Sequence, residues 1–327
     1  MSFIVKTKYI AEIGNNHNGD ISLAKEMIDA AIASKADYIK FQIYNVDKFI
    51  DKKSVFYDEF VKESLSFDEF VELKEYTDSR GGSFLATPFD EDSMNLLNDI
   101  GINVVKIASG DMDNKQLIKQ TISQGKELIV SVGGATVDEI DAMVKYLNDC
   151  NVKFSILHCI INYPARYEEL NLGFITTLKK RYSCPIGYSD HSPDIEASLA
   201  AIALGAIIIE KHFTINRSLP GGDNGMSILP NEFRRLTREG NNIAIALGNG
   251  ERSISEEEKR IKGMIRRKFV AKRDISEGTV ISDADILPLR VVETEKGFGS
   301  GRYYDLIGRK AATNVKQYDI ITEKFFE

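Results

Sequence analysis

Cysteine is scarce in this sequence, with only Cys150, Cys159 and Cys184 among 327 residues. An odd number without a Cys-x-x-Cys pair argues against a disulfide framework or a structural zinc site, and favours a reducing compartment such as the cytoplasm. Long apolar runs are also missing. The longest, residues 199–209, is much shorter than the roughly 20 residues of a membrane-spanning helix. We therefore expect no membrane span, and we interpret residues 1–14 as leading into a first strand, not as a signal peptide.

Excess positive charge is lacking as well, because the formal net charge is −7. Long-range attraction to nucleic acid or to an acidic membrane is therefore not expected, and an anionic ligand would need a local cluster of cations. The sequence contains no Walker A loop and no Gly-x-Ser-x-Gly elbow. With 43% hydrophobic residues, the chain is long enough for a large core and, by length, for two domains.

Eight short strand-like runs alternate with segments of helical periodicity such as 21–34, 67–80, 137–148 and 195–204. The runs begin near residues 9, 38, 83, 104, 128, 154, 185 and 206. Eight βα units over about 250 residues predict a (β/α)8 TIM barrel over residues 1–247, with a doubly wound open sheet as the alternative. A charged segment, 248–263, then predicts a linker, and residues 264–327 a small, mostly β domain.

Polar residues lie in or just after these runs, where the active site of a (β/α)8 barrel is found. A charge inside a strand that is covered on both faces needs a partner. Any one such residue could belong to a buried ion pair that only stabilises the barrel. As a set they predict a site for a phosphate or carboxylate group, formed by two lysines and four hydroxyls: Lys40, Lys106, Thr87, Ser109, Ser131 and Ser189.

Histidines also lie at or just after predicted strand ends. His191 and His212 come from adjacent predicted strands, with the acidic neighbours Asp190 and Glu210. This arrangement suits a catalytic divalent metal with open positions for water and substrate. Each of the other two histidines, taken alone, is more typical of a surface or hydrogen-bonded core position: His17 and His158.

The motifs around these residues resemble the sialic acid synthase family, which comprises the phosphoenolpyruvate-condensing N-acetylneuraminate, legionaminate and pseudaminate synthases. The resemblance covers nearly the whole chain. It rests on AEIGNNHNGD (11–20), ADYIKFQ (36–42), ATPFD (86–90), VKIASGD (105–111), LHC with NYPA (157–165), GYSDHS (187–192) and IEKHFT (209–214). FVAKRDISEG (269–278) and LIGRKA (306–311) resemble the antifreeze-like (SAF) domain that follows the barrel in this family.

This resemblance implies a reaction and a set of roles. The enzyme would condense phosphoenolpyruvate with an open-chain N-acylhexosamine such as N-acetylmannosamine, releasing phosphate by C–O cleavage, with Mn²⁺ as the expected metal and Mg²⁺ or Co²⁺ as alternatives. The lysine and hydroxyl set would bind phosphoenolpyruvate, and His191 and His212 the metal. Glu210 and Glu12 would be the catalytic carboxylates. The sugar would be bound by Gln42, Asp111, Tyr163, Asp223 and Arg290.

The resemblance further implies a domain-swapped homodimer, in which the small domain of one subunit covers the barrel mouth of the other and Arg290 acts in trans. The sequence departs from the family mainly in the sugar-binding half of the motifs. Asp111 replaces a frequent Glu, Ile161-Asn162 replaces an Asn two positions before Tyr163, GGDN (221–224) replaces a GPD-H stretch, and RVVETEKGFG (290–299) replaces an arginine-Pro-Gly turn.

Several functions stay open at this point. The reaction type follows from the intact phosphoenolpyruvate half of the motifs, whereas the product could be a sialic, legionaminic, pseudaminic or related acid made from a modified hexosamine. A Schiff-base aldolase using Lys40 or Lys106 would need no metal. A non-catalytic carbohydrate-binding protein is disfavoured, because a mere binder has no need of a metal beside an anion site.

Overall fold

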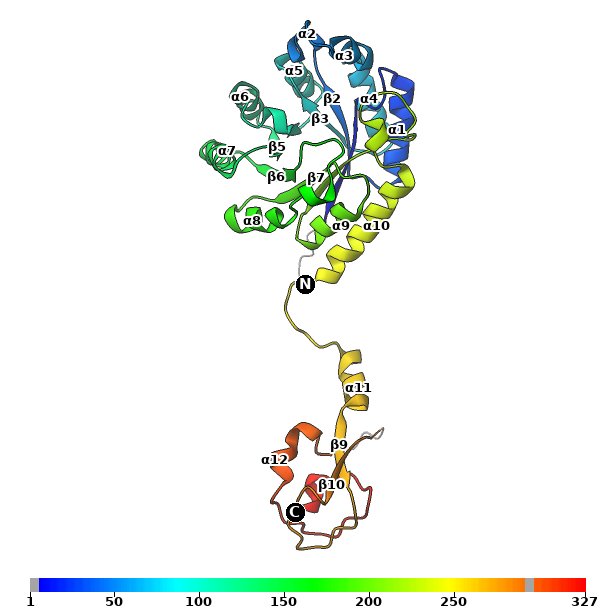
Figure 1. Cartoon of the computed structure of the whole chain (residues 1–327), viewed down its shortest axis with the longest axis vertical. Coiled ribbons are helices and arrows are strands. Elements are labelled where there is room, and N and C mark those ends of the chain that lie inside the picture. Colours follow the sequence, from blue (N-terminus) through cyan, green and yellow to red (C-terminus); the bar gives the residue numbers. More distant parts are fainter. Residues whose placement is uncertain (1–5, 292–296) are drawn as a thin grey trace. The chain divides into compact units, whose positions relative to one another are not determined.

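The computed structural model describes residues 6–291 and 297–327 and divides the chain into two units, Met1–Asn249 and Gly250–Glu327 (Figure 1). Two features of the sequence, the start of the segment 1–14 and the central part of the turn 290–299, lie outside the described residues. Among the helices of the described ranges, none is long and apolar enough to cross a membrane.

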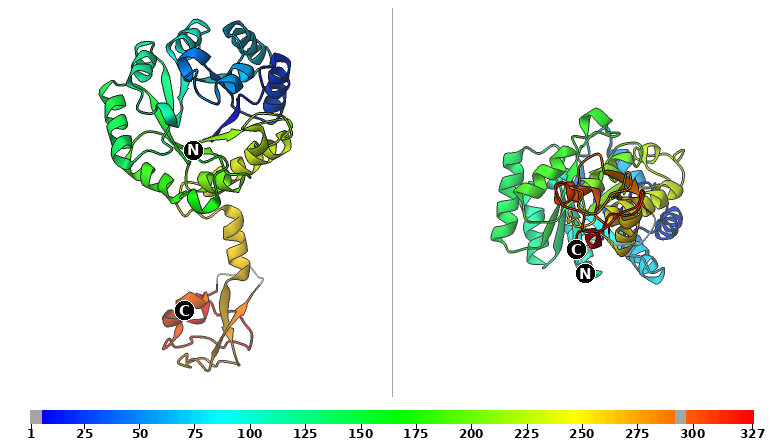
Figure 2. Two further views of the ribbon diagram at one scale, coloured as in Figure 1. Left: turned by 45° about the horizontal axis from the view of Figure 1, so that its top comes forward. Right: turned by 90° about the horizontal axis from the view of Figure 1, so that it is seen from below.

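The N-terminal unit is built on one parallel sheet whose strand order is β3-β2-β1-β8-β7-β6-β5-β4. β3 and β4, at the two ends of this order, lie side by side, so the sheet nearly closes into a barrel (Figure 2). The (β/α)8 prediction is therefore confirmed. The strands are β1 (Lys8–Gly14), β2 (Tyr38–Ile43), β3 (Phe84–Pro88), β4 (Val104–Ile107), β5 (Glu127–Ser131), β6 (Phe154–Cys159), β7 (Ile186–Asp190) and β8 (Ile208–His212).

Helices surround this barrel, and polar side chains fix where several of them begin (Figure 2). Asp20 accepts hydrogen bonds from the first turn of α1, and Ser66 and Thr136 form capping boxes with Glu69 and Glu139 at α4 and α7. Two short helices, α2 and α3, lie between β2 and α4. The helices are α1 (Ile21–Ala33), α2 (Val46–Phe49), α3 (Tyr57–Glu63), α4 (Phe67–Ser79), α5 (Glu91–Asp99), α6 (Lys115–Ser123), α7 (Val137–Asp149), α8 (Gly173–Arg181), α9 (Glu196–Ala203) and α10 (Pro230–Leu247).

The barrel interior is layered. Five strands contribute one apolar layer, which is a cluster distinct from the large core between strands and helices: Ile10, Leu85, Ile129, Leu157 and Ile208. Because side chains alternate along a strand, the residue two positions further on also points inward. On the same five strands that residue is polar or a thiol: Glu12, Thr87, Ser131, Cys159 and Glu210. An apolar floor therefore supports a polar layer nearer the carboxyl ends of the strands.

The C-terminal unit contains α11 (Glu256–Ile265), the antiparallel pair β9 (Arg267–Ala271) and β10 (Ile286–Arg290), and α12 (Tyr303–Leu306). The last expected strand-like run, 311–322, makes only isolated β-bridges, such as Val315 with Ile275. Much of the expected linker 248–263 is helical, because α11 begins at Glu256. This unit has a small hydrophobic core of its own, whose members include Phe269, Ile275, Ile286, Phe298 and Leu306.

Candidate active site

A cavity of about 530 Å³ is bounded by the carboxyl ends of the barrel strands and the loops that follow them. Eleven of the predicted site residues line it: Glu12, Lys40, Gln42, Thr87, Ser109, Ser131, Tyr163, Ser189, His191, Glu210 and His212. The lining within the described chain does not include Lys106, Asp111, Asp223 or Arg290. The sequence therefore placed most of these side chains correctly at one end of the barrel.

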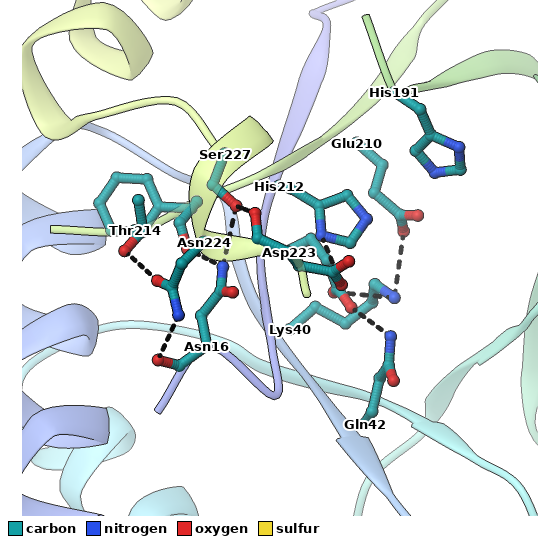
Figure 3. A network of polar contacts seen from close by, with 12 residues as sticks. Asn16, Lys40, Gln42, His191, Glu210, His212, Thr214, Asp223, Asn224 and Ser227 are labelled. Atoms are coloured by element: carbon teal, nitrogen blue, oxygen red, sulfur yellow. Dashed lines mark hydrogen bonds and ion pairs between the residues drawn. The ribbon is translucent and has the colours of Figure 1, made fainter. Parts of the chain in front are cut away.

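A buried network of charges joins β1, β2 and β8 at the base of this cavity (Figure 3). Lys40 Nζ lies 2.8 Å from Glu12 Oε2 and 3.5 Å from Glu210 Oε2, and donates a hydrogen bond to Thr87 Oγ1 at 3.1 Å. Gln42 Nε2 donates to Glu12 Oε1 at 3.3 Å. The strand register explains the first contact, since Glu12 pairs directly with Lys40 across β1 and β2.

Lys106 extends this network from beneath the cavity surface. Its Nζ lies 3.7 Å from Glu210 Oε1 and donates to the Ile107 carbonyl at 3.1 Å. Ser189 Oγ donates to the same Glu210 oxygen at 2.9 Å. Burial opposes ionisation of Glu210, but the ammonium groups of Lys106 and Lys40 outweigh it and hold the pKa of Glu210 below its usual range. Glu210 is therefore ionised at neutral pH.

The two lysines differ in their titration. Burial lowers the pKa of Lys106, with only partial compensation by Glu210. Burial also acts on Lys40, but the carboxylates of Glu12 and Glu210 outweigh it and raise the pKa of Lys40. Where the sequence predicted a simple ring of cations and hydroxyls, the structure therefore pairs both lysines with carboxylates.

Hydrogen bonding in this network is incomplete. Glu12 Oε2 and Glu210 Oε2 are buried and, apart from the Lys40 ammonium at 2.8 and 3.5 Å, have no further partner in the part of the chain that the structure describes. Ser131 Oγ is buried there without any hydrogen-bond partner. A lysine ammonium has three N–H donors, and Lys106 gives one to a carbonyl. Since buried polar groups in folded proteins are normally satisfied, this surplus of donors and acceptors indicates a place for a polar ligand.

The two histidines lie close together at the ends of neighbouring strands: His191 follows β7, and His212 ends β8, where it pairs with Glu12 of β1. Their ring centroids are 5.4 Å apart, and Tyr163 stacks on His191 at 4.0 Å. His191 Nδ1 lies 2.6 Å from the Ile160 carbonyl, which favours a tautomer with a free lone pair on Nε2. Burial, followed by the charge of His212, lowers the pKa of His191 to about 3, so the ring is neutral.

His212 has a carboxylate next to it and an unused nitrogen. Its Nδ1 lies 3.4 Å from Asp223 Oδ2, yet is buried without a hydrogen-bond partner among the described residues. Within those same residues, no group of three or more His, Cys, Asp or Glu side chains could hold a metal alone. The donors present fit a divalent ion held by two imidazoles, with water and substrate in its other positions.

Asp190, which the sequence suggested as an acidic neighbour of this metal site, points the other way. β7 alternates, so Ser189 faces the cavity and Asp190 faces α9. Asp190 Oδ2 lies 3.1 Å from Lys211 Nζ and accepts a hydrogen bond from Ser198 Oγ at 2.5 Å. The interpretation of Asp190 as part of the metal environment was therefore wrong.

The remaining predicted residues lie outside the cavity lining. His17 is buried beside Phe41 and Phe70, and His158 Nε2 lies 2.8 Å from the Leu170 carbonyl, so both have the structural surroundings that the sequence favoured. Asp111 accepts a hydrogen bond from the Asn114 amide. Asp223 lines a neighbouring pocket. Arg290 is an exposed residue at the end of β10 in the C-terminal unit.

Sequence reasoning did not place Cys159 among the site residues. Cys159 lines the cavity, and its Sγ lies 3.8 Å from His191 Nδ1. The alternation of β6 could have revealed this position, because Cys159 follows the inward-facing Leu157 by two residues. Burial raises the pKa of Cys159 to about 11, so the thiol stays protonated.

Comparison with known proteins yields a consistent set of relatives. The model of the NeuB family matches residues 27–252. The N,N'-diacetyllegionaminic acid synthase of Campylobacter jejuni is 35% identical over 97% of this chain and 99% of its own length. The N-acetylneuraminate-9-phosphate synthase of Homo sapiens is 31% identical over 97% and 92%, respectively.

Solved structures show the same likeness. The N-acetylneuraminic acid (sialic acid) synthetase of Leptospira borgpetersenii, determined in complex with citrate, superimposes with a TM-score of 0.76. It is 39% identical in sequence, and the match covers 79% of this chain and 90% of that one. The relatives therefore share both sequence and architecture with this chain.

Proposed function

The chain belongs to the NeuB family of synthases, and from this premise we propose that it condenses phosphoenolpyruvate with an open-chain N-acylhexosamine to form a nonulosonic acid. N-acetylmannosamine would yield a sialic acid, whereas a modified hexosamine would yield a legionaminic or pseudaminic acid. The observation that supports this best is the cavity itself. It brings a lysine–carboxylate network with unused donors and acceptors to the same strand ends as His191, whose ring is neutral, and His212.

Phosphoenolpyruvate is the ligand we assign to the lysine side of the cavity. Lys40, Thr87, Ser131 and Ser189 line this side, and Lys106 contributes charge from beneath. Ser109 belongs to the same set, with its Oγ oriented by the Gly133 N–H at 3.0 Å. Charge-assisted hydrogen bonds to phosphate or carboxylate oxygens are about twice as strong as neutral ones. Such a ligand would use the donor capacity that the lysines retain.

His191 and His212 would hold a divalent metal, for which Mn²⁺ is our choice and Mg²⁺ or Co²⁺ are alternatives. The bound ion would polarise the sugar aldehyde as a Lewis acid. Tyr163 fixes the ring plane of His191 by stacking, and the Ile160 carbonyl fixes its tautomer. A His191→Ala protein that binds Mn²⁺ with unchanged affinity would contradict this assignment.

The carboxylates act on the reacting carbons. As C3 of phosphoenolpyruvate forms a bond to the aldehyde carbon, positive charge develops at C2. The ionised Glu210 stabilises this charge and accepts a proton from the water that adds to C2. The proton that Glu210 has accepted passes to the oxygen of the former aldehyde. The C2–O bond to phosphate then breaks, phosphate leaves with the bonding electrons, and the hydroxyl proton at C2 is lost to phosphate to give the ketone. Glu12, held by Lys40 and Gln42, is the second carboxylate at this centre.

We further propose that the C-terminal unit is an antifreeze-like (SAF) domain and that two chains form a domain-swapped homodimer. In this arrangement Arg290 reaches the N-acyl group of the sugar bound by the partner subunit. Sedimentation at assay concentration tests the proposal. We expect a dimer, and a fully active monomer would contradict it.

The proposed activity is tested by phosphate release from phosphoenolpyruvate. Metal-stripped protein is assayed with and without restored Mn²⁺ across a panel of N-acylhexosamines that includes N-acetylmannosamine. We expect release only when both a sugar and the metal are present. Metal-independent turnover, with covalent trapping by borohydride, would instead establish the Schiff-base aldolase, for which the lowered pKa of Lys106 is the favouring observation.

A further inference from the structure

A second pocket, of about 340 Å³, adjoins the active-site cavity, and we call it the distal pocket. Gln42 lines both the cavity and the distal pocket. Asp223 lines the distal pocket, and its carboxylate lies 3.4 Å from Nδ1 of His212, which lines the cavity. Asp223 lies beside His212 in Figure 3, with Gln42 nearby. An acceptor whose aldehyde lies at the two histidines can therefore extend past Gln42 and Asp223 into this space.

The wall of the distal pocket is acidic and partly aromatic. Helix α3 and the residue before it contribute Glu59, Glu63, Phe56 and Phe60, and the loop after β8 contributes Asp223. No lysine or arginine lines the pocket within residues 6–291 and 297–327. The three carboxylates act on one another, because burial and then the charges of Glu59 and Asp223 raise the pKa of Glu63 to about 7, against a weaker opposing effect of Lys62.

Backbone geometry holds the acidic wall in place. Gly221 has a φ of +97°, and a Cβ at this position would lie 3.0 Å from Glu63 Oε1, so the loop contacts α3 through a residue that has to be glycine. Asn224 ties the same loop to β1 by donating to the Asn16 carbonyl at 3.2 Å, and accepts a hydrogen bond from Thr214 Oγ1 at 2.5 Å (Figure 3).

A buried hydroxyl lies next to residues that line this pocket. Tyr44 OH is buried and has no hydrogen-bond partner in the described part of the chain. It lies close enough to Asn15 and Glu63, which both line the distal pocket, for these groups to affect the pKa of Tyr44. Burial is the main cause that raises this pKa, so the hydroxyl remains a donor at neutral pH.

We propose that the distal pocket receives the end of the acceptor sugar remote from the aldehyde, and that Glu59, Glu63 and Asp223 select an unphosphorylated hexosamine over a hexosamine phosphate. This inference rests on the proposed function. Hydroxyl and amide N–H groups of a neutral sugar find acceptors in these carboxylates, and the rings of Phe56 and Phe60 offer an apolar surface.

A phosphate monoester would be rejected for an electrostatic reason. It carries a charge of about −1.5 to −2 near neutral pH. Placing it beside Glu59, Asp223 and the half-protonated Glu63, with no lysine or arginine lining the described pocket, brings like charges together at a cost of roughly 100-fold in affinity. Condensation adds three carbons before C1 of the hexosamine, so C6 of the sugar becomes C9 of the product. The human relative, by its name, makes a 9-phosphate, which is the product that this pocket disfavours.

The test compares N-acetylmannosamine with N-acetylmannosamine 6-phosphate as acceptors for the full-length protein with Mn²⁺ and phosphoenolpyruvate. We expect kcat/KM to favour the unphosphorylated sugar by roughly 100-fold or more. Glu59→Gln, Glu63→Gln and the double variant remove charge from the pocket while keeping side-chain size. Glu75→Gln, at an exposed position on α4, is the matched control.

Charge removal should reduce the preference at least about tenfold in the double variant, through a lower KM for the phosphorylated sugar, and the control should leave the preference unchanged. Equal use of both sugars by the native protein, or an unchanged preference in all variants, would overturn the proposal. If neither sugar gives turnover, the proposed function fails for these acceptors. Calorimetric titration of both sugars then tests whether the pocket still discriminates between them. Binding of the unphosphorylated sugar alone supports the proposal, whereas equal binding or no binding overturns it.

Discussion

Two buried lysine–carboxylate groups lie on opposite faces of the same barrel, and they differ in how completely their hydrogen bonds are made. On the outer face, Lys211 pairs with Asp190, and Asp190 also accepts hydrogen bonds from Ser192 and Ser198. On the inner face, Glu12 Oε2 and Glu210 Oε2 lie 2.8 and 3.5 Å from the Lys40 ammonium and have no further partner within the described chain.

We interpret this difference as the one between an ion pair that stabilises the barrel and a group that we propose to bind the ligand. Removing charges from water is costly unless the surrounding groups satisfy them fully, and the outer pair meets that condition. The inner group meets that condition less completely, and it is the one that lines a cavity together with His191 and His212. Incomplete hydrogen bonding, more than the presence of buried charge, is therefore the observation on which we base the proposed binding site.

The largest expected effect concerns the inner group. Glu210→Gln keeps the shape of the side chain but removes the charge that would stabilise positive character at C2 and accept a proton. Turnover should fall by about 10²- to 10⁴-fold. Affinity for phosphoenolpyruvate should be kept or increased, because the lysines lose a competing carboxylate. Steady-state kinetics beside the Glu75→Gln control checks this, and normal turnover would remove Glu210 from the mechanism.

The outer pair should show its effect in stability. Lys211→Met leaves Asp190 as an uncompensated buried charge, and we expect the free energy of unfolding to fall by about 3–5 kcal/mol. Activity per folded molecule should be retained. Denaturant unfolding measures the change, with Lys145→Met as the control because the ion pair of Lys145 with Asp149 is exposed. A Lys211→Met protein that folds normally but lacks activity would contradict the assignment of the outer pair to stability alone.

A buried histidine outside the cavity extends the comparison to pH. Burial lowers the pKa of His17 from 6.5 to about 4. The unfolded chain therefore binds more protons than the folded one between these values, and stability falls as the pH drops through this window, by roughly 3 kcal/mol in all. The His17→Asn protein should be less stable than the native protein at neutral pH, but its free energy of unfolding should change less between pH 6.5 and pH 4. An equally steep profile in both proteins would show that another group controls this window.

The smallest effect contrasts the two layers on one strand. Ile129→Val removes a methylene from the apolar floor and should cost about 0.5–1.5 kcal/mol of stability without changing kinetics. Ser131→Ala, two residues on, removes a hydroxyl without a partner in the described chain. It should raise the KM for phosphoenolpyruvate and leave stability nearly unchanged. Reversed effects would contradict the layered assignment.

Much of this arrangement follows from sequence patterns. The hydrophobic runs predicted the starts of all eight barrel strands to within two residues. The polar residues in or just after those runs predicted most of the polar side chains that line the cavity. The error at Asp190 arose because Asp190 was assigned to the site for its position near a strand end, without regard to the alternating direction of side chains along the strand. Glu210 and His212 face inward with Lys211 between them, and the same rule applied to Ser189 would have turned Asp190 outward.

Other features depend on contacts that no local pattern encodes. The pairing of Lys40 with Glu12 depends on the register of β1 and β2, and the acidic distal pocket depends on a loop after β8 packing on α3. Glu59 and Glu63 lie in a short polar helix that carries no motif, so their approach to Asp223 becomes visible only in three dimensions.

The central claim, that the inner charge group is a phosphoenolpyruvate site, is tested most directly by calorimetric titration of phosphoenolpyruvate into the native protein, Lys40→Met and Lys211→Met. This measurement needs no knowledge of the sugar. We expect phosphoenolpyruvate to bind the native protein and the folded fraction of Lys211→Met alike, and to lose at least about tenfold in affinity for Lys40→Met. Unchanged binding in Lys40→Met, or equal losses in both variants, would contradict the account.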